Sequence, residues 1–240
     1  MAGHSKWANI RHRKGAQDKK RAKIFTKLIK EITISSRLGG GDISSNPRLR
    51  KAVSNAKASN LPADKIERAI KKGTGELEGV IYEEVSYECY GPSGVAILLD
   101  IITDNKNRTV AEIRHLLSQF DGNLGESGSV AWMFDKTGQI IMESKSANED
   151  TIFEDAINAG AEDFYVDDNF YLVSTSADQL MEIRDKLDDA GYDIKSAEIE
   201  MVPKTNKILG DLETKKVLKL LDALDDNDDV NKVYTNSDFA

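Results

Sequence analysis

Cationic side chains are concentrated at the start of this sequence, where two histidines and a tryptophan lie among them. Residues 1–72 contain 19 lysines and arginines and 5 aspartates and glutamates, whereas residues 73–240 contain 14 and 36. The formal charges of the two parts are therefore +14 and −22, a contrast that the net charge of −8 conceals. So dense a basic block favours binding of a polyanion. A solvated basic surface without a ligand is the alternative interpretation.

The basic block has side chains suited to a polyanion made of phosphates and rings, such as a nucleic acid. Ammonium and guanidinium groups hold backbone phosphates, while aromatic and imidazole rings stack on bases or ribose. The predicted nucleic-acid contacts are His4, Lys6, Trp7, Arg11, His12, Arg13, Lys14, Lys19, Lys20, Arg21, Lys23, Lys27, Lys30, Arg48, Arg50 and Lys57. Lys106 and Arg108, at the start of a later predicted helix, suggest a secondary contact. Ordinary helix capping explains that second segment equally well.

The sequence contains no pattern typical of a zinc site or of a calcium-binding loop. The three histidines have no cysteine or carboxylate partners at the spacing that zinc ligands require. The acidic run 225–229 lacks the glycine and the distal glutamate of a calcium loop, so we interpret it as a solvated turn. We therefore expect neither a metal nor another cofactor.

Catalytic motifs are equally hard to find. Gly122, Gly125 and Gly128 match neither the dinucleotide-binding motif nor the phosphate loop, and a turn between helix and strand explains them better. Cys89 falls on the inward alternation of a predicted strand, which favours packing over nucleophilic chemistry. An enzyme with its site in residues 103–109 or 122–134 is the weakest hypothesis, and we expect no catalysis.

The bulk composition indicates a protein of the cytoplasm. A single cysteine excludes an intramolecular disulfide framework and suits a reducing compartment. No apolar run approaches the ~18 residues of a membrane span. The basic N-terminal segment lacks the apolar region of a secretory signal. We therefore expect a cytoplasmic protein that does not contact membranes.

Three amphipathic helices are expected to position the basic side chains in a domain of residues 1–75. In the first helix, residues 16–38, apolar residues share one face, and Lys19, Lys23, Lys27 and Lys30 lie roughly opposite. That geometry predicts four ammonium groups free for phosphates. A second helix begins at Asn46 and Pro47, and a third spans residues 64–72. Residues 1–15 show almost no periodicity and are expected to form a loosely docked arm.

Beyond a glycine-rich linker the pattern changes to strands, which predicts an α+β fold. Residues 135–204 have the order βαββαβ, which is that of the ferredoxin-like fold. Residues 80–134 and 205–240 together supply one sheet with two helices, including a short strand at 130–134 and a helix at 109–120. The sequence therefore predicts a three-helix bundle plus two α+β domains, with the ferredoxin-like domain inserted in the other.

Several stretches of this chain resemble the YebC/PmpR family, whose mitochondrial relatives are the translational activators of cytochrome oxidase subunit I. The resemblance covers essentially the whole chain, and its most specific part is residues 1–23. It also rests on Phe25-Thr26-Lys27-Leu28, Asn46-Pro47-Arg48-Leu49-Arg50, Tyr90-Gly91-Pro92, Gly122-Asn123-Leu124-Gly125 and Val233-Tyr234-Thr235-Asn236, and on residues 39–42, 87–88, 103–109 and 128–134. One minor departure is Asn60-Leu61-Pro62, where Asn-Met-Pro is expected.

The resemblance implies three domains, one helical and two α+β, and no catalysis. Bacterial members are generally described as transcriptional regulators that bind DNA, which is our first hypothesis for this chain. The mitochondrial branch points to messenger RNA and the ribosome, so a translation factor that binds ribosomal RNA is the second. Phosphate contacts carry no base information, so the sequence does not separate these two hypotheses. On either hypothesis the acidic domains offer a surface for a protein partner.

Overall fold

The computed structural model describes residues 21–143, 148–167 and 170–238. These form two compact units. We call residues 21–131 and 209–235 the helix–sheet unit, and residues 132–208 and 236–238 the ferredoxin-like unit. The mixed α+β fold with N-terminal helices is confirmed, whereas the division into three domains stays a prediction.

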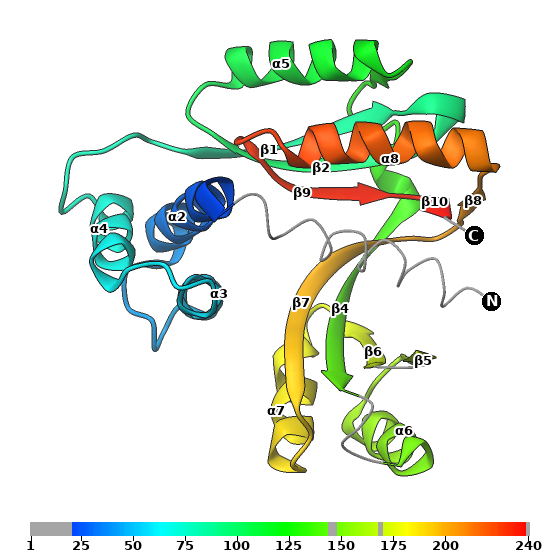
Figure 1. The fold of residues 1–240 in the computed structure, drawn as a ribbon. Coiled ribbons are helices and arrows are strands. Elements are labelled where there is room, and N and C mark those ends of the chain that lie inside the picture. Colours follow the sequence, from blue (N-terminus) through cyan, green and yellow to red (C-terminus); the bar gives the residue numbers. More distant parts are fainter. Residues whose placement is uncertain (1–20, 144–147, 168–169, 239–240) are drawn as a thin grey trace. The chain divides into compact units, whose positions relative to one another are not determined.

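Three helices form the N-terminal part of the helix–sheet unit (Figure 1). They are α2 (Arg21–Gly39), α3 (Pro47–Ala58) and α4 (Ala63–Thr74). Ile32 and Leu49 are fully buried where the three helices meet, and Phe25, Leu28 and Ile29 pack against the same core. The predicted inward faces of the three helices are therefore confirmed, because the apolar side chains at helical spacing have one shared core to fill.

Asn46 fixes the join between α2 and α3. Its Oδ1 accepts the backbone N–H of Leu49 at 3.0 Å, and its Nδ2 donates to the carbonyls of Ser35 at 2.9 Å and Gly40 at 2.8 Å. This buried side chain satisfies one free donor at the start of α3 and two carbonyls at the end of α2.

We expect Asn46→Ala to lower the free energy of unfolding by about 1–2 kcal/mol, because the cap is lost and two carbonyls lose their donor. Urea unfolding followed by circular dichroism measures the change. Asn46→Asp is the matched variant, since an aspartate keeps the N-cap but cannot donate to the carbonyls. If Asn46→Asp were as stable as the wild type, the two bonds to α2 would contribute nothing.

The sheet of the helix–sheet unit has the order β3-β1-β2-β9, with antiparallel pairing throughout. Its strands are β1 (Glu83–Tyr90), β2 (Ala96–Thr103), β3 (Asn123–Leu124) and β9 (Val230–Thr235). The segment Gly91-Pro92-Ser93-Gly94 joins β1 to β2 through the short 3-10 helix η2 (Pro92–Gly94). Helices α5 (Lys106–Gln119) and α8 (Asp211–Asp225) contact each other and pack on this sheet (Figure 1).

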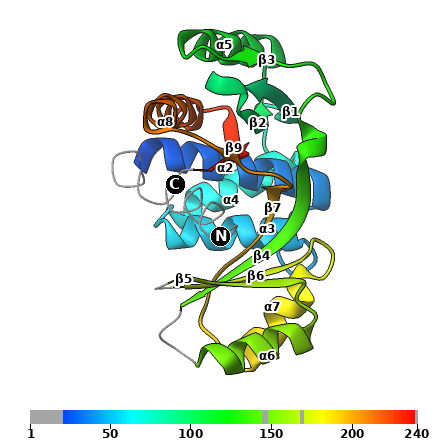
Figure 2. The ribbon, with the colours of Figure 1, turned by 90° about the vertical axis from the view of Figure 1, so that its right-hand side faces the viewer.

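The ferredoxin-like unit has the strand order β5-β6-β4-β7, all antiparallel, with two helices covering one face (Figures 1 and 2). Its elements are β4 (Phe134–Glu143), α6 (Glu149–Ala159), β5 (Asp163–Asp167), β6 (Phe170–Ser176), α7 (Leu180–Asp189) and β7 (Ile194–Pro203). Ile140 and Met142 of β4, Ile152 of α6 and Ile183 of α7 are buried in its core. Strands β8 (Lys207–Ile208) and β10 (Ser237–Asp238) form a separate parallel pair. The ferredoxin-like prediction is confirmed.

The predicted strand at 130–134 is wrong. Residues Ala131–Met133 form the 3-10 helix η3, and Phe134 is already the first residue of β4. The Glu88 carboxylate accepts the backbone N–H groups of Gly128 at 2.6 Å, Val130 at 2.5 Å and Ala131 at 2.7 Å. Donors that converge on one carboxylate are not available to a sheet, so the chain curves instead.

Candidate nucleic-acid interface

The lysines of α2 are bound to another part of the helix–sheet unit. Lys23 Nζ donates to the carbonyl of Asp226 at 2.9 Å. Lys27 Nζ donates to the Asp225 carbonyl at 2.6 Å and forms an ion pair with the Asp225 carboxylate at 3.0 Å. The acceptors lie in residues 225–229, which we call the acidic turn. Cations suit this place, because the last carbonyls of α8 have no partners within their own helix.

Lys30 is more deeply engaged, since it is only 7% exposed. Its Nζ lies 2.5 Å from Asp229 Oδ1 and donates to the Asp228 carbonyl at 2.8 Å. The ammonium also lies 5.6 Å from the centre of the Tyr82 ring, at the distance of a cation–π contact. Lys30 is therefore a buried structural cation.

The Asp229 carboxylate accepts hydrogen bonds from four side chains, and it is only 5% exposed. The other Asp229 oxygen, Oδ2, accepts Arg108 Nη2 at 2.7 Å, Thr109 Oγ1 at 2.7 Å and Thr103 Oγ1 at 3.1 Å. Burial by itself raises the pKa of Asp229, but the bonds from Lys30, Thr109 and Arg108 outweigh it and lower the pKa to about 2. Asp229 is therefore ionised and fully bonded, and it joins α2, β2, α5 and β9.

The expectation that the α2 ammonium groups are free for phosphates is corrected for Lys23, Lys27 and Lys30. The helical periodicity placed them opposite the apolar face, but that side of α2 meets the acidic turn, about 200 positions later in the chain. The periodicity of residues 16–38 carries no information about contacts with a segment so remote in the sequence.

Two arginines that were predicted to bind nucleic acid are also partnered. Arg48 forms ion pairs with Glu31 at 2.7 Å and with Glu84. Arg50 Nε donates to the Ile43 carbonyl at 3.0 Å, and its Nη2 donates to the Ser44 carbonyl at 2.5 Å. Carboxylates neutralise Arg48, whereas Arg50 keeps its full charge on an exposed side chain because carbonyls are its acceptors.

The secondary contact predicted at Lys106 and Arg108 is occupied by carboxylates. Lys106 pairs with Glu83, and Arg108 pairs with Asp104 at 2.8 Å as well as with Asp229. Helix α5 begins at Lys106, three residues earlier than predicted, because Asn105 Oδ1 caps it by accepting the Arg108 N–H at 3.0 Å. The capping interpretation of this segment therefore accounts for its residues.

Besides Arg48 and Arg50, four further exposed cations lie on α3 and α4. Within the described residues, Lys57, Lys65, Arg68 and Lys72 have no carboxylate within 4.0 Å. Of these four, only Lys57 is among the contacts predicted from the sequence. The other three have the spacing i, i+3, i+7, which places them on one side of α4 and could have indicated them.

Several predicted contacts lie outside the described part of the chain, and the structure makes no statement about them. They are His4, Lys6, Trp7, Arg11, His12, Arg13, Lys14, Lys19 and Lys20, together with the side chain of Arg21 and the predicted arm of residues 1–15.

Cys89 is fully buried, as its alternation predicted, and burial raises the pKa of its thiol to about 12. The thiol is therefore protonated at neutral pH and serves as a packing group. In the described ranges, no group of three or more His, Cys, Asp or Glu side chains is arranged to hold a metal ion. No helix among the described residues is long and apolar enough to cross a membrane.

Comparison with known proteins places these features in a family. A model described as "TACO1/YebC protein N-terminal domain" matches residues 5–76, and one described as "TACO1/YebC second and third domain" matches residues 82–237. The chain belongs to the TACO1/YebC family. The resemblance to YebC/PmpR proteins is thereby confirmed.

Relatives of this TACO1/YebC chain align over its full length. Proteins of Desulfosudis oleivorans and Geobacter sulfurreducens are 55% and 53% identical to it over 240 residues, covering 100% of this chain and 98% and 97% of theirs. Both are called probable transcriptional regulatory proteins. The crystal structure of a conserved hypothetical protein from Aquifex aeolicus has a TM-score of 0.85 and 42% identity, and the match covers 93% of this chain and 92% of that one.

Proposed function

We propose that this TACO1/YebC protein is a non-enzymatic regulator that binds nucleic acid, and that its target is DNA in the control of transcription. The observation that carries the proposal is the separation of charge along the chain, +14 in residues 1–72 and −22 in the rest. A basic module attached to acidic ones attracts a phosphate polymer to one part of the molecule and keeps the rest of the chain away from it.

The names of the relatives support the regulatory part of this proposal, since the aligned proteins are called probable transcriptional regulatory proteins. The non-enzymatic part is supported by the way the chemically active side chains are used. Cys89 is buried, Asp229 is saturated with donors, and Glu88 holds the backbone of residues 128–131. Each of these groups has a structural role that leaves it without a free reactive atom.

Binding is expected to depend steeply on salt. If the protein neutralises about six phosphates, its affinity for duplex DNA falls roughly a thousandfold between 50 and 200 mM salt. Fluorescence anisotropy with a labelled 20-base-pair duplex measures this slope. A single-stranded RNA of equal charge, titrated alongside, tests the choice of DNA.

A salt-independent affinity for both polymers would contradict the proposal of nucleic-acid binding. A steep slope with RNA, weak sequence-blind binding to DNA, and sedimentation of the protein with ribosomes would contradict the DNA target. In that case the regulation acts on translation.

A further inference from the structure

We propose that the sugar–phosphate backbone is held by one side of α4, through Lys65, Arg68 and Lys72, with Lys57 in the last turn of α3 as a further contact. We call these four residues the α4 cationic face. The inference rests on the proposed function and adds to it a site that differs from the lysines of α2.

The spacing of the three α4 residues makes them a row. At 100° per residue, positions 65, 68 and 72 lie within an arc of about 60°, and the rise of 1.5 Å per residue spreads them over roughly 10 Å. That length spans several phosphates of one strand, because successive phosphates rise by about 3.4 Å along the axis of duplex DNA. Lys57 belongs to the last turn of α3, and only residues 59–62 separate α3 from α4.

No carboxylate among the described residues forms an ion pair with this row. Lys65, Arg68 and Lys72 are exposed, and the structure places no carboxylate of the described chain within 4.0 Å of them. Of the two acidic residues of α4, Glu67 pairs with Lys71 at 2.6 Å, and Asp64 in the first turn forms no ion pair with the row. By contrast, Lys27 and Lys30 of α2 each pair with an aspartate.

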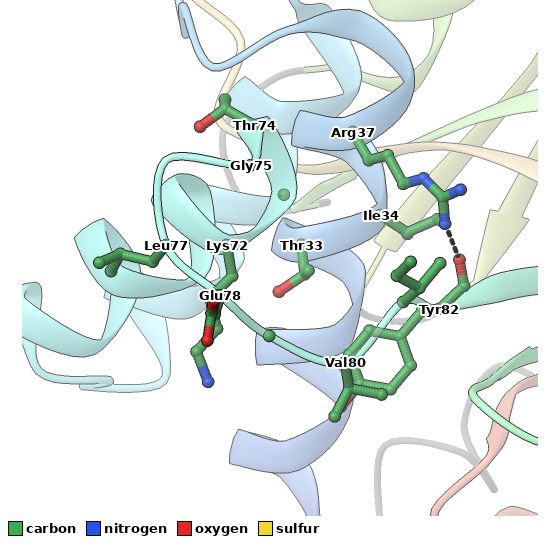
Figure 3. Close-up of a pocket in the computed structure, with 13 residues that line it drawn as sticks. Thr33, Ile34, Arg37, Lys72, Thr74, Gly75, Leu77, Glu78, Val80 and Tyr82 are labelled. Atoms are coloured by element: carbon green, nitrogen blue, oxygen red, sulfur yellow. Dashed lines mark hydrogen bonds between the residues drawn. The ribbon is translucent and has the colours of Figure 1, made fainter.

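The end of the row lies at a cleft of about 320 Å³ between the C-terminal turns of α2 and α4 and the segment 75–82 (Figure 3). A Cβ on Gly79 would lie 3.1 Å from Lys72 Cδ, so the alkyl stem of Lys72 runs along the linker, which helps to hold its direction. Arg37 lines the same cleft from α2, where its Nη1 donates to the Tyr82 carbonyl at 2.8 Å, so its charge is retained. Glu78 also lines the cleft, and its negative charge marks the edge of the positively charged surface on this side.

The other side of α4 builds the core, so the row is separable from the fold. Ile66 and Ala69 are buried, and Ile70 packs partly against the same core. At 100° per residue the row lies about 120° around the helix from this core side, and its three side chains are exposed. Substitution of the row is therefore expected to change binding and to leave unfolding unaffected.

The test is the full chain carrying Lys65→Gln, Arg68→Gln and Lys72→Gln, titrated with the labelled duplex at several salt concentrations. Loss of three phosphate contacts reduces the magnitude of the salt slope by about 2.7 and weakens binding on the order of a hundredfold at 100 mM salt. The matched control is Lys136→Gln, Lys215→Gln and Lys219→Gln, which removes the same charge from other exposed positions. A charge-preserving variant, Lys65→Arg with Lys72→Arg, should keep the wild-type slope.

Equal losses in the α4 variant and the matched control would overturn the inference, because only net charge would then matter. An unchanged slope in the α4 variant would overturn it as well. Failure of the proposed function is distinguishable, because the wild-type protein itself would then show no salt-dependent binding to nucleic acid. Thermal unfolding of each variant confirms that the comparison is made between folded proteins.

Discussion

Asp229→Asn should destabilise the helix–sheet unit by about 3–5 kcal/mol at neutral pH, the range measured when one partner of a buried ion pair is removed. The Lys30 ammonium would keep the Asp228 carbonyl as an acceptor but lose its buried counter-charge. The amide of the new side chain would also face the hydroxyl and guanidinium donors of Thr109 and Arg108. Both effects raise the free energy of the folded state alone.

The same variant has a characteristic dependence on pH. The folded-state pKa of Asp229, about 2, is below its ordinary value of 3.8, so its ionisation stabilises the folded protein above that value. This contribution is lost as the pH falls through about 2. The difference in stability between wild type and Asp229→Asn should therefore be largest near neutral pH and narrow in acid.

Urea unfolding at pH 7 and at pH 2.5 measures both effects. Lys30→Met combined with Asp229→Asn supplies the control, because no ammonium then remains buried without a counter-charge. The double variant should recover part of the lost stability. Additive effects of the two substitutions, with no coupling between them, would refute the assignment of this pair as the junction between α2 and the sheet.

Gly73→Ala should lower the stability of the helix–sheet unit by about 2 kcal/mol, although alanine is the better helix former. A Cβ at this position would lie 2.4 Å from the Thr33 carbonyl oxygen and 2.7 Å from Ser36 Cβ, both on α2. The first neighbour is backbone and cannot turn aside, so α4 must move away from α2. The helix propensity of alanine offsets only about 1 kcal/mol of that cost.

The sign of the change makes this a decisive measurement by thermal or urea unfolding. Ser54→Ala, at an exposed position of α3, is the control, because its new methyl group meets solvent. That variant should be as stable as the wild type or slightly more stable. A stabilised Gly73→Ala protein would show that α2 and α4 do not approach each other through this glycine.

The sequence by itself determined the separation of charge and the existence of most helices and strands. Ile32, Leu49 and Ile66 each lie on the apolar face of their own amphipathic helix, and all three are buried in the bundle as expected. The ferredoxin-like order of elements could also be predicted, because local periodicity indicates each helix and strand. Capping residues such as Asn148 and Gly160 mark where a helix begins and ends. Helices, strands and caps depend mainly on interactions between residues that are close in the sequence.

The tertiary structure alone decided which cations are free. Lys27 and Lys65 look alike in sequence, yet Lys27 pairs with Asp225 while Lys65 is exposed beside its neighbours on α4. The short strand expected at 130–134 was wrong for a related reason, since Glu88 draws the N–H groups of that segment together from 40 positions away. Ion pairs and hydrogen bonds act through space, and a charge is neutralised by whatever the fold brings within about 4 Å, however distant it is along the chain.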